Sequence, residues 1–340
     1  MSVRDVGERG LIDLFSELIE GFPREVLPFG DDAVGIPFGD DVLVINTDML
    51  VGRTDVPPGM SYWQAGRKAV VMNVSDVVAK GAKPVGAVFS LGFPRHTSTD
   101  EAVELVRGLN AGCREYEFYY LGGDTNECSD LVVSGTVFGL AKRNSVVSRR
   151  GANPGDVVAV TGPFGLTAMG LKILLEDLSA DPQSKKLSLH AVYEPRARMR
   201  EGIVLSERNV LSSCIDSSDG LAWSLYELSK MSGVGFIIDS IPVPKEVQIF
   251  AESHGLDYVD LALYGGEEFE LVVTVPSVKW NRAVDSVKVV GGTLYPIGTV
   301  TEGKDIVLRL PNQAEKRIDP RGFEHFRGEI KERSGGPGEI

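Results

Sequence analysis

The sequence predicts a mixed α/β (α+β) protein built from two domains. Short apolar runs of strand length alternate with longer segments of helical periodicity in both halves of the chain. A loop rich in Gly, Asn and Pro near residue 150 separates the two halves. We therefore expect an N-terminal domain over residues 1–145, a C-terminal α/β domain over residues 146–328 and a flexible tail over residues 329–340.

The charge and the cysteine content exclude several classes of protein. The 48 acidic and 35 basic residues give a net charge of −13, and no run of Lys and Arg would attract nucleic acid or an anionic lipid surface. The three cysteines form no CxxC pair, which argues against a zinc site or a disulfide framework. No apolar segment resembles a signal peptide or approaches the roughly 20 residues that span a bilayer. We expect a cytoplasmic protein without nucleic-acid or membrane partners.

The beginning of the chain predicts a helix and then a β-hairpin. The short amphipathic helix is indicated by the helical spacing of Leu11, Leu14, Phe15, Leu18 and Ile19. The pentapeptide PFGDD occurs at residues 28–32 and again at residues 37–41, where it separates two apolar runs and indicates a hairpin turn. Asp40 and Asp41 then have a structural role. If the hairpin pivots near residue 40, Asp32 of the first copy lies opposite Asp48, and two opposed carboxylates favour a shared divalent cation.

The next segments predict two helices and two strands. A helix is expected over about residues 61–80, with Asn73 and Asp76 on one face of its most apolar part. Burying a carboxylate on an apolar face is costly without a partner, although the position could also be a partly exposed polar edge. A second helix over about residues 98–115 precedes a strand that ends at Gly122-Gly123-Asp124, where the glycines allow a ligand to approach closely. Residues 131–141 predict a further strand.

The second half continues the mixed pattern after a crossing over residues 141–156. The strand at residues 157–162 leads through a glycine-bearing turn to a helix from about Leu166, and this turn either holds an anion or only connects the two elements. Asp216 and Asp219 lie at the beginning of another helix. Asp219 could be an N-cap, a role that Asp216 does not fit. Glu267 and Glu268 immediately precede a strand.

The acidic residues at these turns and strand ends indicate a magnesium-dependent nucleotide site. Carboxylates are hard ligands for Mg²⁺ or Ca²⁺, and the four histidines lie outside the motifs. No EF-hand spacing is present, and several Mg²⁺ ions commonly accompany a nucleotide polyphosphate. The chain has neither a Walker A sequence nor the motifs of a protein kinase, so a phosphoryl-transfer enzyme would use another scaffold.

Eight motifs between about Gly7 and Phe326 carry a family resemblance. In order they are FGDDAV, NTDMLV, RKAVVMNVSDVVAKGAKP, LGGDT, SRRGANPGD, VTGPFG, IDSSDGL and GGEEFEL. Their order and spacing resemble those of the thiamine-monophosphate kinases, which belong to the superfamily of aminoimidazole ribonucleotide synthetase. The resemblance implies transfer of a phosphate from ATP to thiamine monophosphate. It also implies a homodimer of two-domain subunits, whose N-terminal domains form a shared β-barrel.

The resemblance also implies roles for individual residues. The implied Mg²⁺ ligands are Asp32, Asn46, Thr47, Asp48, Asp76, Asp124, Asp216 and Asp219. The implied ATP contacts are Gly123, Asp124, Arg149 and Ser218. The implied substrate contacts are Asp55, Glu267 and Phe323, although Phe323 could instead be a small C-terminal core contact. Asp216, Asp219 and Arg149 are expected to act directly on the transfer.

Three positions depart from the family pattern. Asp55 stands where the family usually has a substrate-side histidine, and a carboxylate cannot donate to a phosphate unless it is protonated. Asn46 replaces a serine or threonine, and GGEEFEL replaces GGEDYEL, but both changes keep the chemistry of the site. Two alternatives stay open: an ATP-dependent ligase similar to aminoimidazole ribonucleotide synthetase, and a nucleotide-binding regulator without turnover. The absence of a cysteine before Cys113 and the C-terminal GGPGEI argue against selenophosphate synthetase and the hydrogenase-maturation relative.

Overall fold

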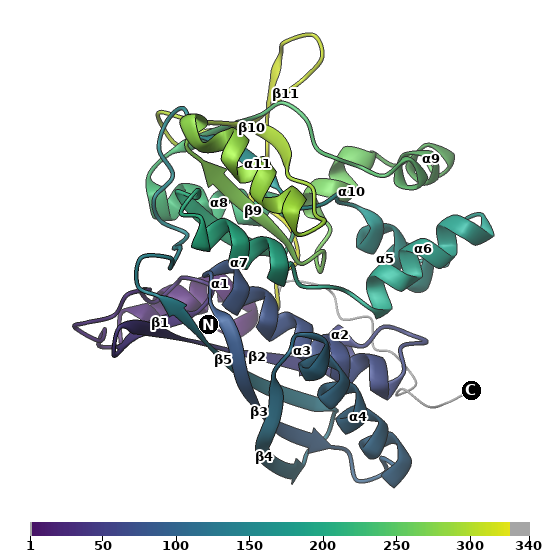
Figure 1. The fold of residues 1–340 in the computed structure, drawn as a ribbon. Helices are drawn as coiled ribbons and strands as arrows, with labels where there is room; N and C mark the ends of the chain where they lie inside the picture. Colours follow the sequence, from purple (N-terminus) through teal and green to yellow (C-terminus); the bar gives the residue numbers. More distant parts are fainter. Residues whose placement is uncertain (1, 327–340) are drawn as a thin grey trace.

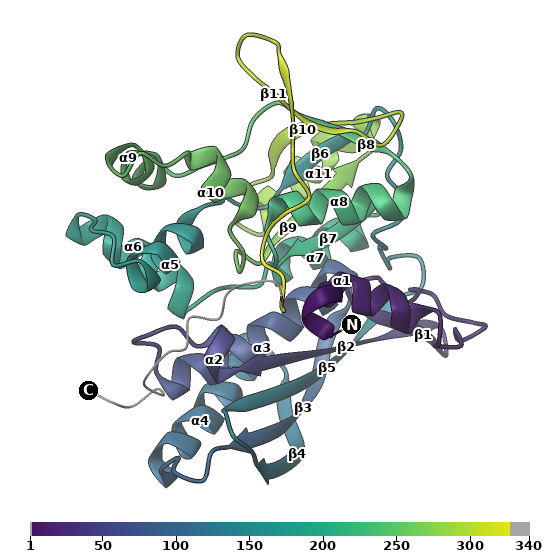
Figure 2. The same ribbon diagram turned by 180° about the vertical axis from the view of Figure 1, so that it is seen from behind.

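Two β-sheets organise the two halves of the chain in the computed structural model, which describes residues 2–326. Figure 1 shows the five-stranded sheet of the first half below the seven-stranded sheet of the second half, and Figure 2 shows the same arrangement from behind. The mixed α/β class and the two-domain organisation are confirmed. The chain passes between the sheets over residues 143–156, in the expected crossing. The predicted tail at residues 329–340 lies outside the described residues.

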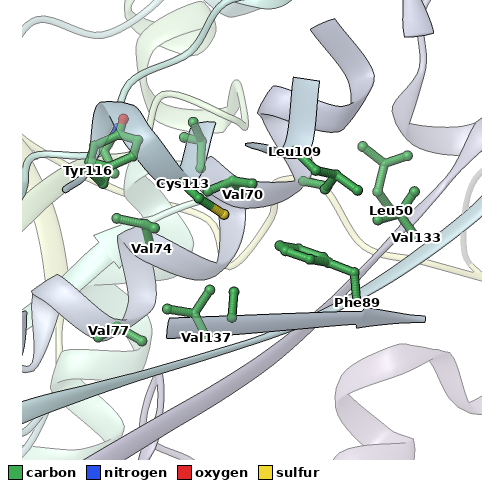
Figure 3. Close-up of a cluster of buried hydrophobic side chains, with 14 of the residues drawn as sticks. Leu50, Val70, Val74, Val77, Phe89, Leu109, Cys113, Tyr116, Val133 and Val137 are labelled. Atoms are coloured by element: carbon green, nitrogen blue, oxygen red, sulfur yellow. The ribbon is translucent and has the colours of Figure 1, made fainter. Parts of the chain in front are cut away.

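The first half contains four helices and five strands within the described residues. They are α1 (Val3–Ser16), β1 (Val34–Phe38), β2 (Asp41–Val51), α2 (Gly52–Asp55), α3 (Tyr62–Ala79), β3 (Lys83–Phe93), α4 (Thr99–Glu115), β4 (Tyr119–Glu127) and β5 (Val132–Lys142). The strand order is β1-β2-β5-β3-β4, in which β3 and β4 are parallel and the other pairs are antiparallel. Side chains from α3, α4 and the sheet meet in one apolar core (Figure 3).

The second half places helices on both faces of its sheet. The elements are β6 (Val157–Val160), α5 (Leu166–Leu175), α6 (Pro182–Tyr193), α7 (Met199–Glu207), β7 (Ser213–Ser217), α8 (Leu221–Ser232), β8 (Gly235–Ile238), α9 (Lys245–Ser253), α10 (Tyr258–Tyr264), β9 (Glu270–Val275), a 3₁₀ turn η1 (Ser277–Lys279), α11 (Trp280–Val289), β10 (Tyr295–Thr301), β11 (Ile306–Arg309) and β12 (Glu315–Arg317). The apolar side chains of α8 cover one face, and those of α7 and α11 cover the other. The edge strand β7 packs against α3 of the first half.

The second PFGDD copy forms the hairpin turn, as expected, but the register differs by one residue. Phe38 pairs with Asp41, which leaves Gly39 and Asp40 as a two-residue turn, and Gly39 has the positive φ of 60° that such turns favour. Paired residue numbers therefore sum to 79 and not to 80. The predicted opposition of Asp32 and Asp48 is wrong, because Asp32 precedes β1, whose pairing with β2 begins at Val34 opposite Ile45. Asp41 instead pairs with Lys142 at the surface.

Within the described chain the first sheet is open, and no closed barrel is found. β1 and β4 are its two edge strands. α3 and α4 cover one face, and the opposite face exposes several large apolar side chains: Met49, Val85, Val88, Tyr119 and Leu121. The expected β-barrel is therefore absent from a single chain, since closure would require pairing of the edge strands.

The sequence indicated that the strand β4 ends at the glycine pair, and this prediction is wrong. The strand continues through Asp124 to Glu127 beside β3. A Cβ atom on Gly123 would lie 1.7 Å from the carbonyl oxygen of Phe89 on β3. Gly123 is thus required by the close approach of the neighbouring strand.

The predicted helices at residues 61–80 and 98–115 are confirmed as α3 and α4, and glycines bring them together. Ser61 and Ser98 are the N-caps, each in a capping box. A Cβ on Gly108 would lie 1.9 Å from the carbonyl oxygen of Trp63, and a Cβ on Gly66 would lie 2.2 Å from that of Leu105. The backbones of the two helices therefore touch at this crossing.

We expect the Gly108→Ala substitution to separate α3 from α4 and to reduce the free energy of unfolding by about 3 kcal/mol. The loss arises because the new methyl group meets a backbone atom that cannot move alone. Urea unfolding followed by circular dichroism measures it. Gly21→Ala is the matched control, because the nearest atom to its Cβ lies 3.8 Å away in a flexible side chain. Equal stability of the two variants would contradict the prediction.

Candidate active site

Three carboxylates from distant parts of the chain meet where the two domains touch. Asp32 precedes β1, Asp76 lies in α3 and Asp216 lies in β7. Each offers an oxygen atom, and these atoms lie within 4.8 Å of one another. Figure 1 shows α3 beneath the second domain, and its packing against β7 brings the carboxylates together. The sequence-based expectation that acids from both halves converge is met for these three residues.

Neighbouring polar groups hold each carboxylate in place. The Asn46 amide donates to Oδ2 of Asp76 at 2.6 Å, and the Ser75 hydroxyl donates to Oδ2 of Asp216 at 2.8 Å. Nε of Arg149 donates to Oδ1 of Asp32 at 2.6 Å. The oxygen atoms that face one another are therefore oriented by the protein before any ligand binds.

The electrostatics of this cluster favour a bound cation. Burial, followed by the charge of Asp216, raises the pKa of Asp76 well above its usual range. Burial and the charge of Asp32 raise the pKa of Asp216 to about 7. Burial and the charges of Asp219 and Asp55 raise the pKa of Asp48 to about 6. Carboxylates that resist ionisation because they are buried together become stable anions when a hard divalent cation joins them, so the donor set fits Mg²⁺.

Beneath the cluster lies a buried ion-pair network that sequence reasoning missed. Nζ of Lys80 lies 2.6 Å from both Oδ1 of Asp31 and Oδ2 of Asp32, and it donates to the Cys214 carbonyl at 2.8 Å. Asp31 also accepts hydrogen bonds from the Ser148 hydroxyl and the Arg149 amide. The two aspartates of the first PFGDD copy therefore differ in role. Asp31 binds Lys80, Ser148 and Arg149 in the buried network, whereas Asp32 also belongs to the carboxylate cluster. The sequence marked Lys80 only as the end of a helix.

Two of the three predicted substrate residues, Glu267 and Phe323, lie close to Asp219. The backbone amide of Phe323 donates to the Asp219 carbonyl at 3.0 Å. Its Cβ is 3.6 Å from the position that a Cβ on Gly266 would take, next to Glu267. A fully buried lysine, Lys68, forms an ion pair with Glu267 and donates to the Asp55 carbonyl at 2.8 Å. Lys68 was also missed, because its place in an apolar helix gave no sign of its distant partner.

Asp55 has internal partners in the structure. Oδ2 of its carboxylate accepts from the Val51 amide at 2.7 Å and from the Thr54 hydroxyl at 3.0 Å. This carboxylate therefore stabilises the turn that leads into α2. A contact between Asp55 and the substrate remains a prediction.

Some predicted ligands are not brought into the cluster. The Thr47 side chain lies on the other face of β2 from Asn46, and its hydroxyl donates to the Gly135 carbonyl. Gly123 and Asp124 are exposed on the edge strand β4. Asp219 is not an N-cap, since Gly220 holds that position in α8 without a side-chain cap.

A cavity of about 140 Å³ adjoins the cluster. Its lining includes Arg149, Asp216, Ser218 and Asp219, together with Arg9 of α1 and Trp223 of α8. Predicted metal ligands and predicted ATP contacts therefore share one cavity. This places Ser218 and Arg149 where a ligand bound by the carboxylates would meet them.

The glycine-bearing turn before α5 is occupied by a side chain of the protein itself. Oε1 of Glu268 accepts from the Gly165 amide at 2.6 Å and from the Thr167 amide at 3.3 Å. The amides of this helix N-terminus thus donate to a carboxyl group of the protein itself, which favours the structural interpretation of this turn over an anion site.

We expect the Glu268→Gln variant to gain stability relative to the unchanged protein as the pH rises. Burial raises the pKa of Glu268 from 4.5 to about 7, so the folded state prefers the protonated form. The folded state of the unchanged protein therefore loses stability relative to the unfolded state as the pH rises from about 4.5 to 7. The Glu268→Gln variant does not lose this stability, because glutamine does not titrate. The difference is at most about 3 kcal/mol. Melting temperatures at pH 5 and pH 8 test it, and a difference independent of pH would refute it.

Comparison with known families matches both domains. The family model of AIR synthase related protein, N-terminal domain, matches residues 30–141, and that of the C-terminal domain matches residues 153–311. A curated thiamine-monophosphate kinase of Pyrococcus horikoshii is 37% identical over 318 residues, which are 93% of this chain and 96% of the relative. One of Nitrosopumilus maritimus is 34% identical over 312 residues, which are 92% and 98% of the two chains.

Solved structures have the same fold over nearly the whole chain. The structure of AaThiL complexed with AMPPCP and TMP has a TM-score of 0.84 and 27% sequence identity, and the similarity covers 96% of this chain and 99% of that one. The structure of tt0281 from Thermus thermophilus has a TM-score of 0.83 and 31% identity, with coverage of 91% and 100%. The two-domain arrangement is therefore shared with these proteins.

Proposed function

We propose that this chain, which belongs to the AIR synthase related family and within it to the thiamine-monophosphate kinases, transfers a phosphoryl group from ATP to thiamine monophosphate. The observation that carries the proposal is the meeting of Asp32, Asp76 and Asp216 beside the cavity that contains Arg149 and Ser218. The curated relatives named thiamine-monophosphate kinase support it, as does AaThiL, which was solved with AMPPCP, an analogue of ATP, and with TMP.

Mg²⁺ is the cation that we propose for the cluster. Asp32, Asp76 and Asp216 would hold it, and bound Mg²⁺ would supply positive charge that neutralises the phosphate oxygens. Asp48 and Asp219 adjoin these three residues and would complete the set. Asn46, Thr47 and Asp124 stay as proposed ligands from the family resemblance. Of these, Thr47 would act through its main chain, because its hydroxyl already donates to Gly135.

The residues of the site act by positioning and by charge. The attacking phosphate oxygen of thiamine monophosphate is already anionic at neutral pH, so no general base is required. Two unit charges 4 Å apart repel by about 4 kcal/mol at an effective dielectric constant of 20. Arg149, held by Asp32 and by the Gly30 carbonyl, would offset this repulsion, and Glu267 and Phe323 would orient the thiamine portion. Transfer is then direct and in line, without a covalent enzyme intermediate.

We also propose that two chains form a homodimer, in which their open sheets pair into a shared barrel. The exposed apolar side chains of the uncovered sheet face support it. Light scattering on the purified protein should give twice the mass of one chain, and a mass of one chain would contradict the dimer.

A cytoplasmic location is also part of the proposal. The three free cysteines agree with it, because disulfide bonds are rare in the cytosol.

The test of the function is a direct assay. The purified protein is incubated with ATP, Mg²⁺ and thiamine monophosphate, and thiamine diphosphate is separated from the reaction. Formation of thiamine diphosphate together with ADP is the expected result. A ligase or a regulator without turnover would form none, so absence of this product over the whole range of Mg²⁺ concentrations would reject the kinase.

A further inference from the structure

An arginine of the first helix forms an ion pair with one of the proposed cation ligands. Nη2 of Arg9 lies 2.9 Å from Oδ2 of Asp219, and the same guanidinium group forms an ion pair with Glu227. Its central carbon lies 3.7 Å from the centre of the Trp223 ring, and its Nε is buried without a hydrogen-bond partner. Arg9 therefore brings a second guanidinium group, besides that of Arg149, to the wall of the cavity.

Arg9 and a divalent cation compete for Asp219. Both are positively charged, so a cation bound to this carboxylate repels the guanidinium group beside it. When Mg²⁺ binds Asp219, the guanidinium group of Arg9 is expected to bind the nearest negative charge of the ligand that accompanies the cation. That charge is the polyphosphate of the nucleotide, for which guanidinium groups are suited donors.

The attachment of α1 allows such a change of partner. Gly7 has a φ of 76° and kinks α1 two residues before Arg9. Beyond Arg9, α1 is tied to α8 by Asp13, whose carboxylate pairs with Lys230 at 3.1 Å on the exposed surface. Arg9 can therefore shift within the cavity by a local change at the kink, and the exposed Asp13–Lys230 pair lies outside the lining of the cavity. Figure 2 shows α1 between α8 and the first sheet, beside the junction of the two domains.

We propose that Arg9 is a nucleotide-binding residue, which pairs with Asp219 before a ligand binds and moves to the phosphates of the nucleoside triphosphate when the cation binds Asp219. This inference rests on the proposed function, because it requires that ATP and Mg²⁺ bind in this cavity. It assigns a role to the first helix, which the family resemblance did not include.

Calorimetric binding of Mg²⁺-AMPPCP to the full-length Arg9→Gln and Lys230→Gln variants tests the proposal. The Arg9→Gln variant should bind about tenfold more weakly, the loss expected for one charge-assisted contact. The Lys230→Gln variant removes only the surface tie of α1 and should bind as the unchanged protein does. Arg9→Lys should recover part of the affinity. Equal weakening in the Arg9→Gln and Lys230→Gln variants, or no weakening in either, would overturn the proposal.

Tryptophan fluorescence reports the movement directly. In a Trp63→Phe, Trp280→Phe background, Trp223 is the remaining tryptophan of the chain. Its emission should change when Mg²⁺-AMPPCP is added, because Arg9 leaves the ring, and the change should be absent after Arg9→Gln. An unchanged emission in this background, with binding confirmed by calorimetry, would overturn the proposal. If the unchanged protein binds no Mg²⁺-AMPPCP, the proposed function itself fails, which is a separate result.

Discussion

The Asp76→Asn variant should form thiamine diphosphate about a thousandfold more slowly than the unchanged protein. Asp76 lies at the centre of the acidic cluster, where it faces Asp32 and Asp216 and accepts a hydrogen bond from Asn46. An amide keeps the size of the side chain but removes the charge that would bind Mg²⁺. Steady-state assays at saturating ATP measure the effect.

The same variant should be more stable than the unchanged protein when no divalent cation is present. The folded state raises the pKa of Asp76, so stability from the protonated form is lost as the pH rises through that value, and asparagine avoids this loss. Melting temperatures at pH 8 with a chelator test this. Adding Mg²⁺ should raise the melting temperature of the unchanged protein and leave that of Asp76→Asn nearly constant.

Asp41→Asn provides the matched control for Asp76→Asn. Asp41 belongs to the second PFGDD copy and pairs with Lys142 at the surface, so it has no part in the acidic cluster. The Asp41→Asn variant should keep full activity and the full response to Mg²⁺. Full activity of Asp76→Asn, or equal loss in both variants, would show that the acidic cluster is not the site of transfer.

The Lys80→Met substitution should destabilise the protein by about 3 to 5 kcal/mol. Lys80 is fully buried and its ammonium group lies between the carboxylates of Asp31 and Asp32, so the substitution leaves two buried carboxylates without their shared partner. Methionine fills a similar volume, which limits the effect of a cavity. Urea unfolding in the presence of a chelator gives the free energy, and a loss similar to that of Lys142→Met, at an exposed pair, would contradict the expectation.

A double variant separates charge from packing at this position. Asp31→Asn combined with Lys80→Met removes one of the two buried carboxylates that lose their shared lysine, so it should recover part of the lost stability. The two residues act independently if Asp31→Asn lowers the free energy of unfolding by the same amount in the Lys80→Met variant as in the unchanged protein. The buried network would then not be the source of the loss.

Local patterns predicted the main elements of the fold. The helical periodicity of the sequence placed α3 and α4 correctly to within about two residues. The second PFGDD copy predicted the hairpin turn for the same local reason. The register of that hairpin could not be derived, because a turn of two residues and a turn of three residues fit the same letters. The end of β4 was also wrong, since Gly123 is required by a backbone oxygen on β3.

The amino-acid sequence by itself determined which residue types are available: acidic residues in a set order, separated by strands and helices, a pattern that predicts a magnesium and nucleotide site. Only the tertiary structure decided which side chains meet. Packing of α3 against β7 joins Asp76 to Asp216, and the same packing buries Lys80 below Asp31 and Asp32. The physical reason is that periodicity fixes the face on which a residue lies, whereas its partner across the domain junction depends on contacts between segments more than a hundred residues apart.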